Sequence, residues 1–177
     1  MATEEQMKGK ELDKLLVRIA AGDNAAFEEL YVRTKRGVYS FLYTYFHNAA
    51  DTEDAMQSAY LNIKRGIHTY RPGSNASAWI LQIAKNLALN EIKKKSREVP
   101  TEEIDLGATL NEGGRYEITD LMQRVLTEEE QRIVTLHVVW NYKHREIAEM
   151  LGVPTGTVTS KYKRSIEKLK NAFKEEP

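Results

Sequence analysis

Apolar residues recur at helical spacing along nearly the whole chain, and the alternation that is typical of β-strands does not occur at any useful length. Within Glu11–Ala21, for example, one face of the expected helix carries only apolar residues, namely Leu12, Leu15, Leu16 and Ile19. A chain of 177 residues is long enough for one domain or for two small ones. The periodicity therefore predicts an all-α protein.

The helical period breaks once, over Arg97–Glu117. This stretch contains one proline, three glycines and few large apolar residues, and residues 97–118 include six acidic and two basic side chains. Such a composition is typical of a linker. We therefore expect two small helical domains, residues 1–96 and residues 119–177, joined by a flexible acidic linker of residues 97–118.

Composition excludes several classes of function. The absence of cysteine excludes disulfides and cysteine-based zinc sites. None of the four histidines has a partner at a familiar ligand spacing, so we expect neither a metal nor a cofactor. The sequence contains no pairing of a nucleophile with a base, so we do not expect an enzyme. No apolar run is long enough for membrane insertion, and the N-terminus lacks the apolar core of a signal peptide, so we expect a cytoplasmic protein.

The formal net charge is zero, but the charge is unevenly distributed along the chain. Lys85–Arg97 holds five basic residues and one acidic residue, and Pro154–Lys174 holds six and one. Two separate basic helical segments are typical of a protein that binds nucleic acid. Charge alone favours the alternative, in which the basic faces are simply solvated.

The segment Glu146–Leu169 predicts two helices joined by a sharp turn. Gly152 follows the apolar positions of the first helix, where a left-handed residue closes a turn without steric cost. Pro154 suits the first turn of the second helix, because its missing N–H would be unpaired there. One side of the second helix is an apolar stripe, Val158, Tyr162, Ile166, Leu169 and Phe173. The other side carries hydroxyls and cations, as a recognition helix in the major groove does; an ordinary helical hairpin is the alternative.

The sequence HREIAEMLGVPTGTVTSKYKRSIEKL resembles the fourth conserved region of bacterial sigma factors, and most closely that of the extracytoplasmic-function (ECF) group. This resemblance implies that the minus-thirty-five promoter element is bound by Thr157, Thr159, Ser160, Lys161, Lys163 and Arg164. Three positions depart from the family pattern: Lys161 replaces an arginine, Asn141 a glycine and Lys143 a helix-capping serine. Lysine cannot make the planar two-pronged base contact of arginine, so the change at Lys161 bears on base specificity. The changes at Asn141 and Lys143 bear on where the helix starts.

A fourth helix is expected from Ser77 to about Lys95. One face of it combines an aromatic, amide and cationic residues, namely Trp79, Gln82, Asn86, Asn90 and Lys93. Amides can hydrogen-bond to base edges and cations can contact phosphates. The alternative is a core helix whose C-terminal lysines are stabilised by the helix dipole.

This helix also resembles the second conserved region of the sigma family, through Trp79, Ile83, Ala84 and Asn86 of its W…IA.N pattern. In that family the helix and the loop before it capture the melted non-template strand of the minus-ten element. The resemblance implies the same role for Tyr70, Arg71, Asn75, Ser77, Asn86, Asn90, Lys93 and Lys94. Extruding a base costs a few kcal/mol of unstacking, which stacking and amide contacts can offset.

The segment DTEDAMQSAY predicts the start of a third helix, with Asp51 at its N-cap. Acidic residues in a first turn are favoured by the helix dipole, which alone would explain them. The segment also resembles the family's AED..Q motif, which docks on the coiled coil of the clamp in the largest subunit of RNA polymerase. The polymerase-binding residues implied by the resemblance are Asp51, Glu53, Asp54 and Gln57.

The favoured hypothesis is therefore a sigma factor that binds core RNA polymerase and recognises and opens promoter DNA. By the same resemblance, the acidic linker would pass near the polymerase active-site channel, and an anti-sigma factor is an expected partner. The alternative is a stand-alone helix-turn-helix regulator, in which residues 1–96 form a sensor or dimerisation domain.

Overall fold

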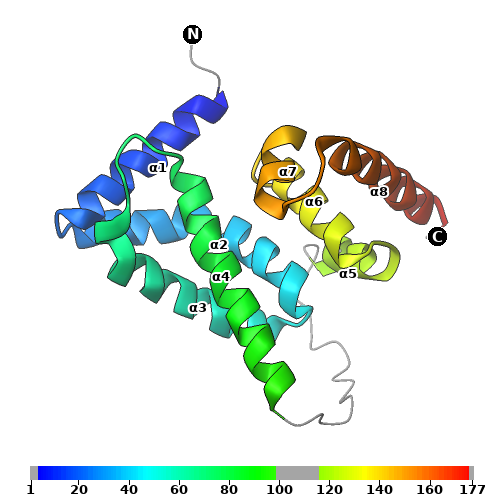
Figure 1. Cartoon of the computed structure of the whole chain (residues 1–177), viewed down its shortest axis with the longest axis horizontal. Helices are drawn as coiled ribbons and strands as arrows, with labels where there is room; N and C mark the ends of the chain where they lie inside the picture. Colours follow the sequence, from blue (N-terminus) through cyan, green and yellow to red (C-terminus); the bar gives the residue numbers. More distant parts are fainter. Residues whose placement is uncertain (1–3, 99–115, 176–177) are drawn as a thin grey trace. The chain divides into compact units, whose positions relative to one another are not determined.

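The computed structural model describes residues 4–98 and 116–175 (Figure 1). All regular secondary structure in these two ranges is helical, and the chain forms two compact units divided between Ile104 and Asp105. The predicted all-α class is thus confirmed for the described residues. Most of the predicted linker lies outside them; its first residue, Arg97, ends one helix, and its last three, from Tyr116, begin another.

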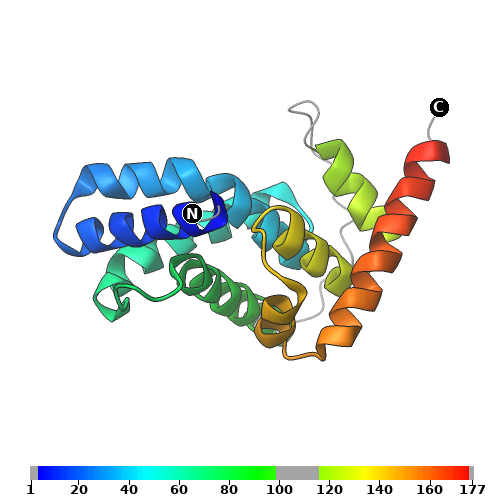
Figure 2. The same ribbon diagram turned by 90° about the horizontal axis from the view of Figure 1, so that it is seen from above.

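The first unit contains α1 (Glu4–Ala20), α2 (Asn24–Phe46), α3 (Ala49–Gly66), the short 3₁₀-helix η1 (Ile67–Thr69) and α4 (Ala76–Arg97). Helix α1 extends seven residues further toward the N-terminus than its apolar stripe predicted. Helices α1 and α2 lie side by side (Figure 2), and α2 and α4 each contact the other three α-helices of this unit. Their apolar faces form one core, whose fully buried side chains include Leu16, Leu30, Phe41, Ile63 and Ile80.

Three helices of the first unit begin at a side-chain cap. Asp23 accepts a hydrogen bond from the N–H of Ala26, Asn48 from that of Asp51, and Asn75 from that of Ala78. The prediction that Asp51 caps α3 was wrong, because Asn48 lies in extended conformation three residues earlier and satisfies the free N–H group. Asp51 instead lies in the first turn of the helix.

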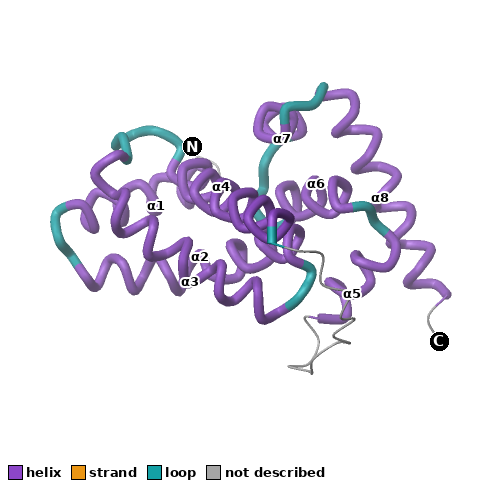
Figure 3. Tube along the Cα trace, turned by 60° about the horizontal axis from the view of Figure 1, so that its bottom comes forward, coloured by secondary structure: helices purple, strands orange, loops and turns teal. Residues whose placement is uncertain are grey.

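The second unit contains α5 (Tyr116–Val125), α6 (Glu128–Val138), α7 (His144–Leu151) and α8 (Thr155–Glu175). Helix α8 contacts the other three and completes their core, which includes Leu121, Ile133, Leu136, Ile147 and Val158. Short loops separate these helices (Figure 3). Thr127 followed three residues later by Glu130 is a sequence pattern that predicts a capping box, and the structure confirms it. Each side chain accepts a hydrogen bond from the other residue's N–H, at 3.3 and 2.9 Å.

Candidate functional site

The predicted turn between α7 and α8 is confirmed at Gly152. This residue has φ 69°, and its N–H and that of Val153 both donate to the carbonyl of Ala148. Pro154 lies one residue before α8 rather than inside it. Its carbonyl accepts from the N–H groups of Thr157 and Val158, so it begins the hydrogen bonding of the helix.

Helix α8 is held against its unit by a row of buried and half-buried residues. Val158 and Ser165 are fully buried, and the Ser165 hydroxyl donates to the carbonyl of Lys161 at 2.6 Å. Sequence reasoning missed Ser165, although it lies seven residues after Val158 and so on the same helical face. Phe173, predicted to belong to the apolar stripe, is 54% exposed because it lies in the last turns of the helix.

The residues expected to bind the minus-thirty-five element lie in the first three turns of α8. Thr159, Ser160, Lys163 and Arg164 are exposed, whereas Thr157 and Lys161 are half-buried. Two of the six side chains have partners within the unit. The Lys161 ammonium forms an ion pair with Glu129 of α6, and the Thr159 hydroxyl lies 3.0 Å from Nδ1 of His144.

An aromatic cluster lies next to these residues and joins α8 to α6 and α7. The rings of His137, His144 and Tyr162, from α6, α7 and α8, have centroid separations of 4.6 to 5.1 Å. Burial lowers the pKa of His144 below 6.5, and the nearby His137 acts in the same direction. Nε2 of His144 is buried without a hydrogen-bond partner among the described residues, so the neutral ring is favoured.

Two departures from the family pattern have a local explanation. Asn141 has φ 63°, in the left-handed region that glycine favours and that asparagine tolerates better than most residues. The side chain of Lys143 offers no acceptor at the start of α7, but the Glu146 carboxylate reaches back and accepts the Lys143 N–H at 2.8 Å. The loop between α6 and α7 therefore accommodates both Asn141 and Lys143.

In the first unit, one face of α4 is open to solvent. Asn86, Asn90, Lys93 and Lys94 are exposed, and Asn86 accepts a hydrogen bond from the Gln82 side chain at 2.9 Å. These four members of the expected strand-capturing set therefore lie on the solvent-exposed surface of α4.

Of the remaining members, Tyr70, Arg71 and Asn75 belong to the loop before α4, and Ser77 lies in the first turn of the helix. Arg71 and Asn75 are exposed, but Asn75 also caps α4 and accepts the Ser77 hydroxyl at 3.0 Å. Tyr70 is buried, with its ring edge-on to Trp79 at 5.3 Å. Tyr70 and Ser77 thus support the loop and the start of α4, whereas the Arg71 side chain is open to solvent.

A carboxylate on α1 holds this loop, and sequence reasoning did not identify it. Oδ1 of Asp13 accepts the Tyr70 hydroxyl at 2.5 Å and the Gly73 N–H at 2.8 Å. The Tyr70 hydrogen bond, and then that of Gly73, lower the pKa of Asp13. Burial, followed by the bond to Asp13, raises the pKa of Tyr70 to about 12. No sequence pattern joins residues that lie 57 positions apart.

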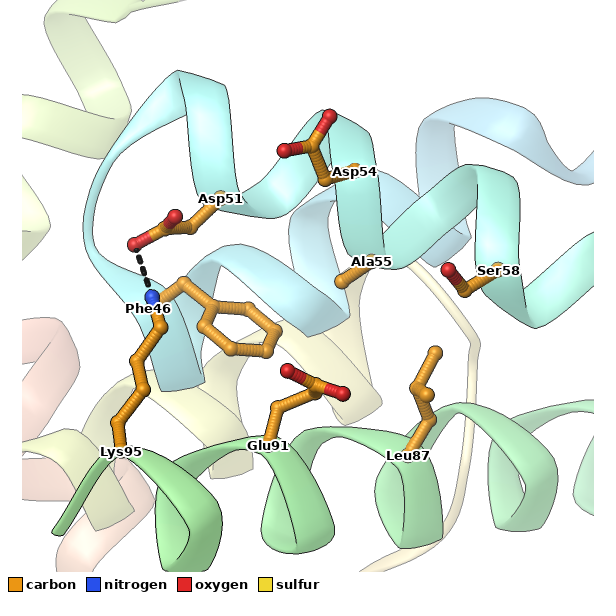
Figure 4. Close-up of a pocket in the computed structure, with 8 residues that line it drawn as sticks. All are labelled: Phe46, Asp51, Asp54, Ala55, Ser58, Leu87, Glu91 and Lys95. Atoms are coloured by element: carbon orange, nitrogen blue, oxygen red, sulfur yellow. Dashed lines mark hydrogen bonds and ion pairs between the residues drawn. The ribbon is translucent and has the colours of Figure 1, made fainter. Parts of the chain in front are cut away.

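The residues expected to bind polymerase lie along the first turns of α3. Glu53, Asp54 and Gln57 are exposed, and Asp51 is half-buried at a small open hollow of about 220 Å³ between α3 and α4. In Figure 4 the Asp54 carboxylate points away from α4, whereas Asp51 forms an ion pair with Lys95 at 2.8 Å. The hydrogen bonds from Lys95 and then Asn48 lower the pKa of Asp51.

Within residues 4–98 and 116–175, no group of three His, Cys, Asp or Glu side chains is arranged to hold a metal ion. None of the helices described there is both long and apolar enough to cross a membrane.

Two sequence profiles match the chain: Sigma-70 region 2 matches residues 30–98, and Sigma-70 region 4 matches residues 117–169. Together they span more than half of the chain. The ECF RNA polymerase sigma-E factor of Escherichia coli is 29% identical over 178 residues, covering 90% of this chain and 93% of the relative. The ECF RNA polymerase sigma factor SigM of Mycobacterium tuberculosis is 28% identical over 159 residues, covering 88% and 81%.

Two solved structures have the same fold. CnrH, in complex with the cytosolic domain of CnrY, gives a TM-score of 0.65 at 16% identity, over 94% of this chain and 99% of that one. RpoE of Bartonella quintana, in complex with the anti-sigma factor NepR, gives a TM-score of 0.65 at 18% identity, over 85% and 98%.

Proposed function

Because the chain belongs to the ECF group of sigma-70 factors, which direct transcription initiation by RNA polymerase, we propose a specific division of labour between its two units. The first unit docks on core polymerase and captures the melted minus-ten strand. The second unit recognises the minus-thirty-five element. A stand-alone regulator does not account for the region 2 match, so that alternative is not retained.

The observation that carries the proposal for the second unit is the two-sided character of α8. Its buried side holds Val158 and Ser165, while hydroxyl and cationic side chains are exposed on its first three turns. A helix held from behind in this way can enter a major groove without losing its own packing. Thr157, Thr159, Ser160, Lys161, Lys163 and Arg164 are the proposed contacts.

The proposal for the first unit rests on two surfaces. The loop before α4 and the open face of α4 offer arginine, amide and lysine side chains, which suit an unpaired strand. The strand contacts we propose are Arg71, Asn75, Asn86, Asn90, Lys93 and Lys94, whereas Tyr70 and Ser77 of the expected set support the loop and the start of α4. The edge of α3 offers a basic surface of the polymerase clamp the exposed carboxylates of Glu53 and Asp54 and the amide of Gln57. The half-buried carboxylate of Asp51 completes the proposed set.

Regulation and location complete the proposal. Two proteins of the same fold were solved in complex with CnrY and with the anti-sigma factor NepR, and an anti-sigma factor is therefore the proposed regulator of this chain. Because polymerase and promoter DNA are its partners, the cytoplasm is its proposed location.

Reconstitution with core polymerase on duplex and pre-melted promoter libraries tests the proposal. We expect promoter opening and selective enrichment of sequences only when this chain is present. Equal opening by core polymerase alone would overturn the proposed function.

Two substitutions separate docking from strand capture. Asn86→Ala should impair opening of duplex promoters while core binding is retained, whereas Asp54→Ala should weaken core binding. Asn62→Ala on α3 and Glu28→Ala on α2 remove exposed side chains of the same kinds and serve as controls. The reverse pattern of defects would exclude these assignments.

A further inference from the structure

Helix α1 is hydrogen-bonded to the loop before α4, although it lies before the region 2 match, which begins at residue 30. It contacts both η1 and α4, the two elements that flank the loop. The contact made by Asp13 differs from the apolar packing of α1, because it reaches the loop backbone itself.

The two hydrogen bonds converge on one atom. Oδ1 of Asp13 accepts both the Tyr70 hydroxyl, from the start of the loop, and the Gly73 N–H, from its middle. The second acceptor near the Tyr70 hydroxyl, the Ser74 carbonyl, is more distant at 3.3 Å. Hydrogen bonds to a charged acceptor are stronger than those between neutral groups, so the Asp13 carboxylate is a strong link between the loop and α1.

The loop needs such a link because its own bonds are local. Gly73 has φ 80°, and the hydrogen bonds within the loop join Ser74 to the carbonyl of Arg71. Arg71 and Asn75 are exposed on either side of Gly73. Fixing Tyr70 and Gly73 therefore fixes the direction in which Arg71 leaves the loop, while the cap on α4 fixes that of Asn75.

We propose that Asp13 is a positioning residue for promoter opening: it holds residues 70–75 in the conformation that presents Arg71 and Asn75 to the melted minus-ten strand. This inference rests on the proposed function of the first unit. It adds α1 to the strand-binding machinery without direct contact with DNA.

The two effects that Asp13 could have on DNA binding, through its charge and through its hydrogen bonds, are opposite in sign. A carboxylate near a strand of phosphates opposes binding, so its removal should strengthen DNA binding if charge were its only effect. Loss of a positioning contact has the opposite consequence, because a loop that samples several conformations binds more weakly. Asp13→Asn separates the two effects, since its amide oxygen can occupy the place of Oδ1 and accept both hydrogen bonds.

The experiment measures binding of the holoenzyme, reconstituted with core polymerase, to a fluorescent single-stranded minus-ten oligonucleotide selected in the promoter library. We expect Asp13→Ala to weaken strand binding by about tenfold, as the loss of roughly one charged hydrogen bond would. Core affinity should be unchanged, and Asp13→Asn, which keeps both acceptor contacts without the charge, should weaken strand binding much less than Asp13→Ala does. Glu11→Gln is the matched control, because it removes the same charge from α1 but contacts Arg33 and not the loop.

Equal or tighter strand binding by Asp13→Ala, or equal weakening by Asp13→Ala and Asp13→Asn, would overturn the proposal. Tyr70→Phe, which deletes one of the two donors, provides a second test should Asp13→Ala fold poorly, and unchanged strand binding by it would also count against the proposal. Failure of the proposed function would look different: the parent holoenzyme would not prefer the selected strand to a scrambled one, and Arg71→Ala would have no effect.

Discussion

Nζ of Lys95 on α4 lies 2.8 Å from Oδ2 of Asp51 on α3, so the helix proposed to bind promoter DNA is paired with the edge proposed to bind polymerase. Nζ also lies 6.0 Å from the centre of the Phe46 ring, over the same hollow. Both charged side chains are about half exposed, at 53% and 40%. Such a pair contributes little to folding, but it occupies the Asp51 carboxylate, which is one of the proposed polymerase contacts.

Lys95→Gln should change the free energy of unfolding by less than about 1 kcal/mol, because the ion pair is exposed to solvent and screened by salt. The Asp51 carboxylate then loses its internal partner, and we expect tighter binding to core polymerase. Urea unfolding and core titration measure the two effects. Lys93→Gln, from the same turn, is the control; a loss of core affinity in Lys95→Gln would contradict this interpretation.

Glu129→Gln should increase affinity for the minus-thirty-five element, by up to about fivefold, because it releases the Lys161 ammonium from its ion pair. Binding to a duplex in the presence of core polymerase, at fixed salt, is the measurement. Glu128→Gln removes the same charge from the adjacent position, where the carboxylate pairs with Arg132 of its own helix. Equal gains in the two variants would indicate a general charge effect and not the release of Lys161.

Gly152→Ala and Gly156→Ala should have opposite effects on stability. Alanine at residue 152 must adopt φ near 69°, which costs roughly 1–2 kcal/mol. Residue 156 lies within α8 with open space around its position, so alanine there should stabilise by roughly 0.5–1 kcal/mol. Chemical unfolding of the full chain compares them, and a loss of stability in Gly156→Ala would show that glycine is required there for another reason.

The fold was largely predictable because its signals are local. Apolar periodicity, the Thr127–Glu130 capping box and Gly152 each depend on residues within a few positions of one another, and the structure confirms all three. The N-cap of α3 was assigned to Asp51 because an acid before a helix is a strong signal, yet Asn48 offered the same chemistry one turn earlier. The first residue of a helix depends on which of several possible N-cap residues adopts an extended conformation, and composition does not decide that.

The candidate site was predictable only in part. Motif positions identified the exposed residues of α8 and α4, but not the side chains that hold them. Asp13, Glu129 and His144 each contact a predicted residue from another helix, at sequence separations of 57, 32 and 15. Such contacts depend on how the helices pack, and a single sequence contains no periodic signal for them.

Acidification below about pH 6.5 should destabilise the second unit, because the pKa of His144 is lowered in the folded state. Between the folded pKa and 6.5 the unfolded chain binds more protons, so stability is complete above 6.5 and is lost as the pH falls. The fluorescence of Trp140, in a Trp79→Phe background, reports unfolding of this unit at about pH 7.5 and about pH 5.5.

His144→Gln should reduce this pH dependence, whereas His68→Gln, at an exposed position of the first unit, should retain it. An identical pH dependence in the parent and in His144→Gln would exclude His144 as its source.

The Lys168 ammonium lies 2.9 Å from both carboxylate oxygens of Glu130, the residue that also completes the capping box of α6. This contact and the buried Ser165 both lie beyond the first two turns of α8. The exposed positions Ser160, Lys163 and Arg164 therefore form a set that can be randomised while the contacts that hold the helix, including that of Thr159 with His144, are kept. The second unit is accordingly a suitable scaffold for engineered sigma factors with orthogonal promoters, selected as libraries at these three positions alone.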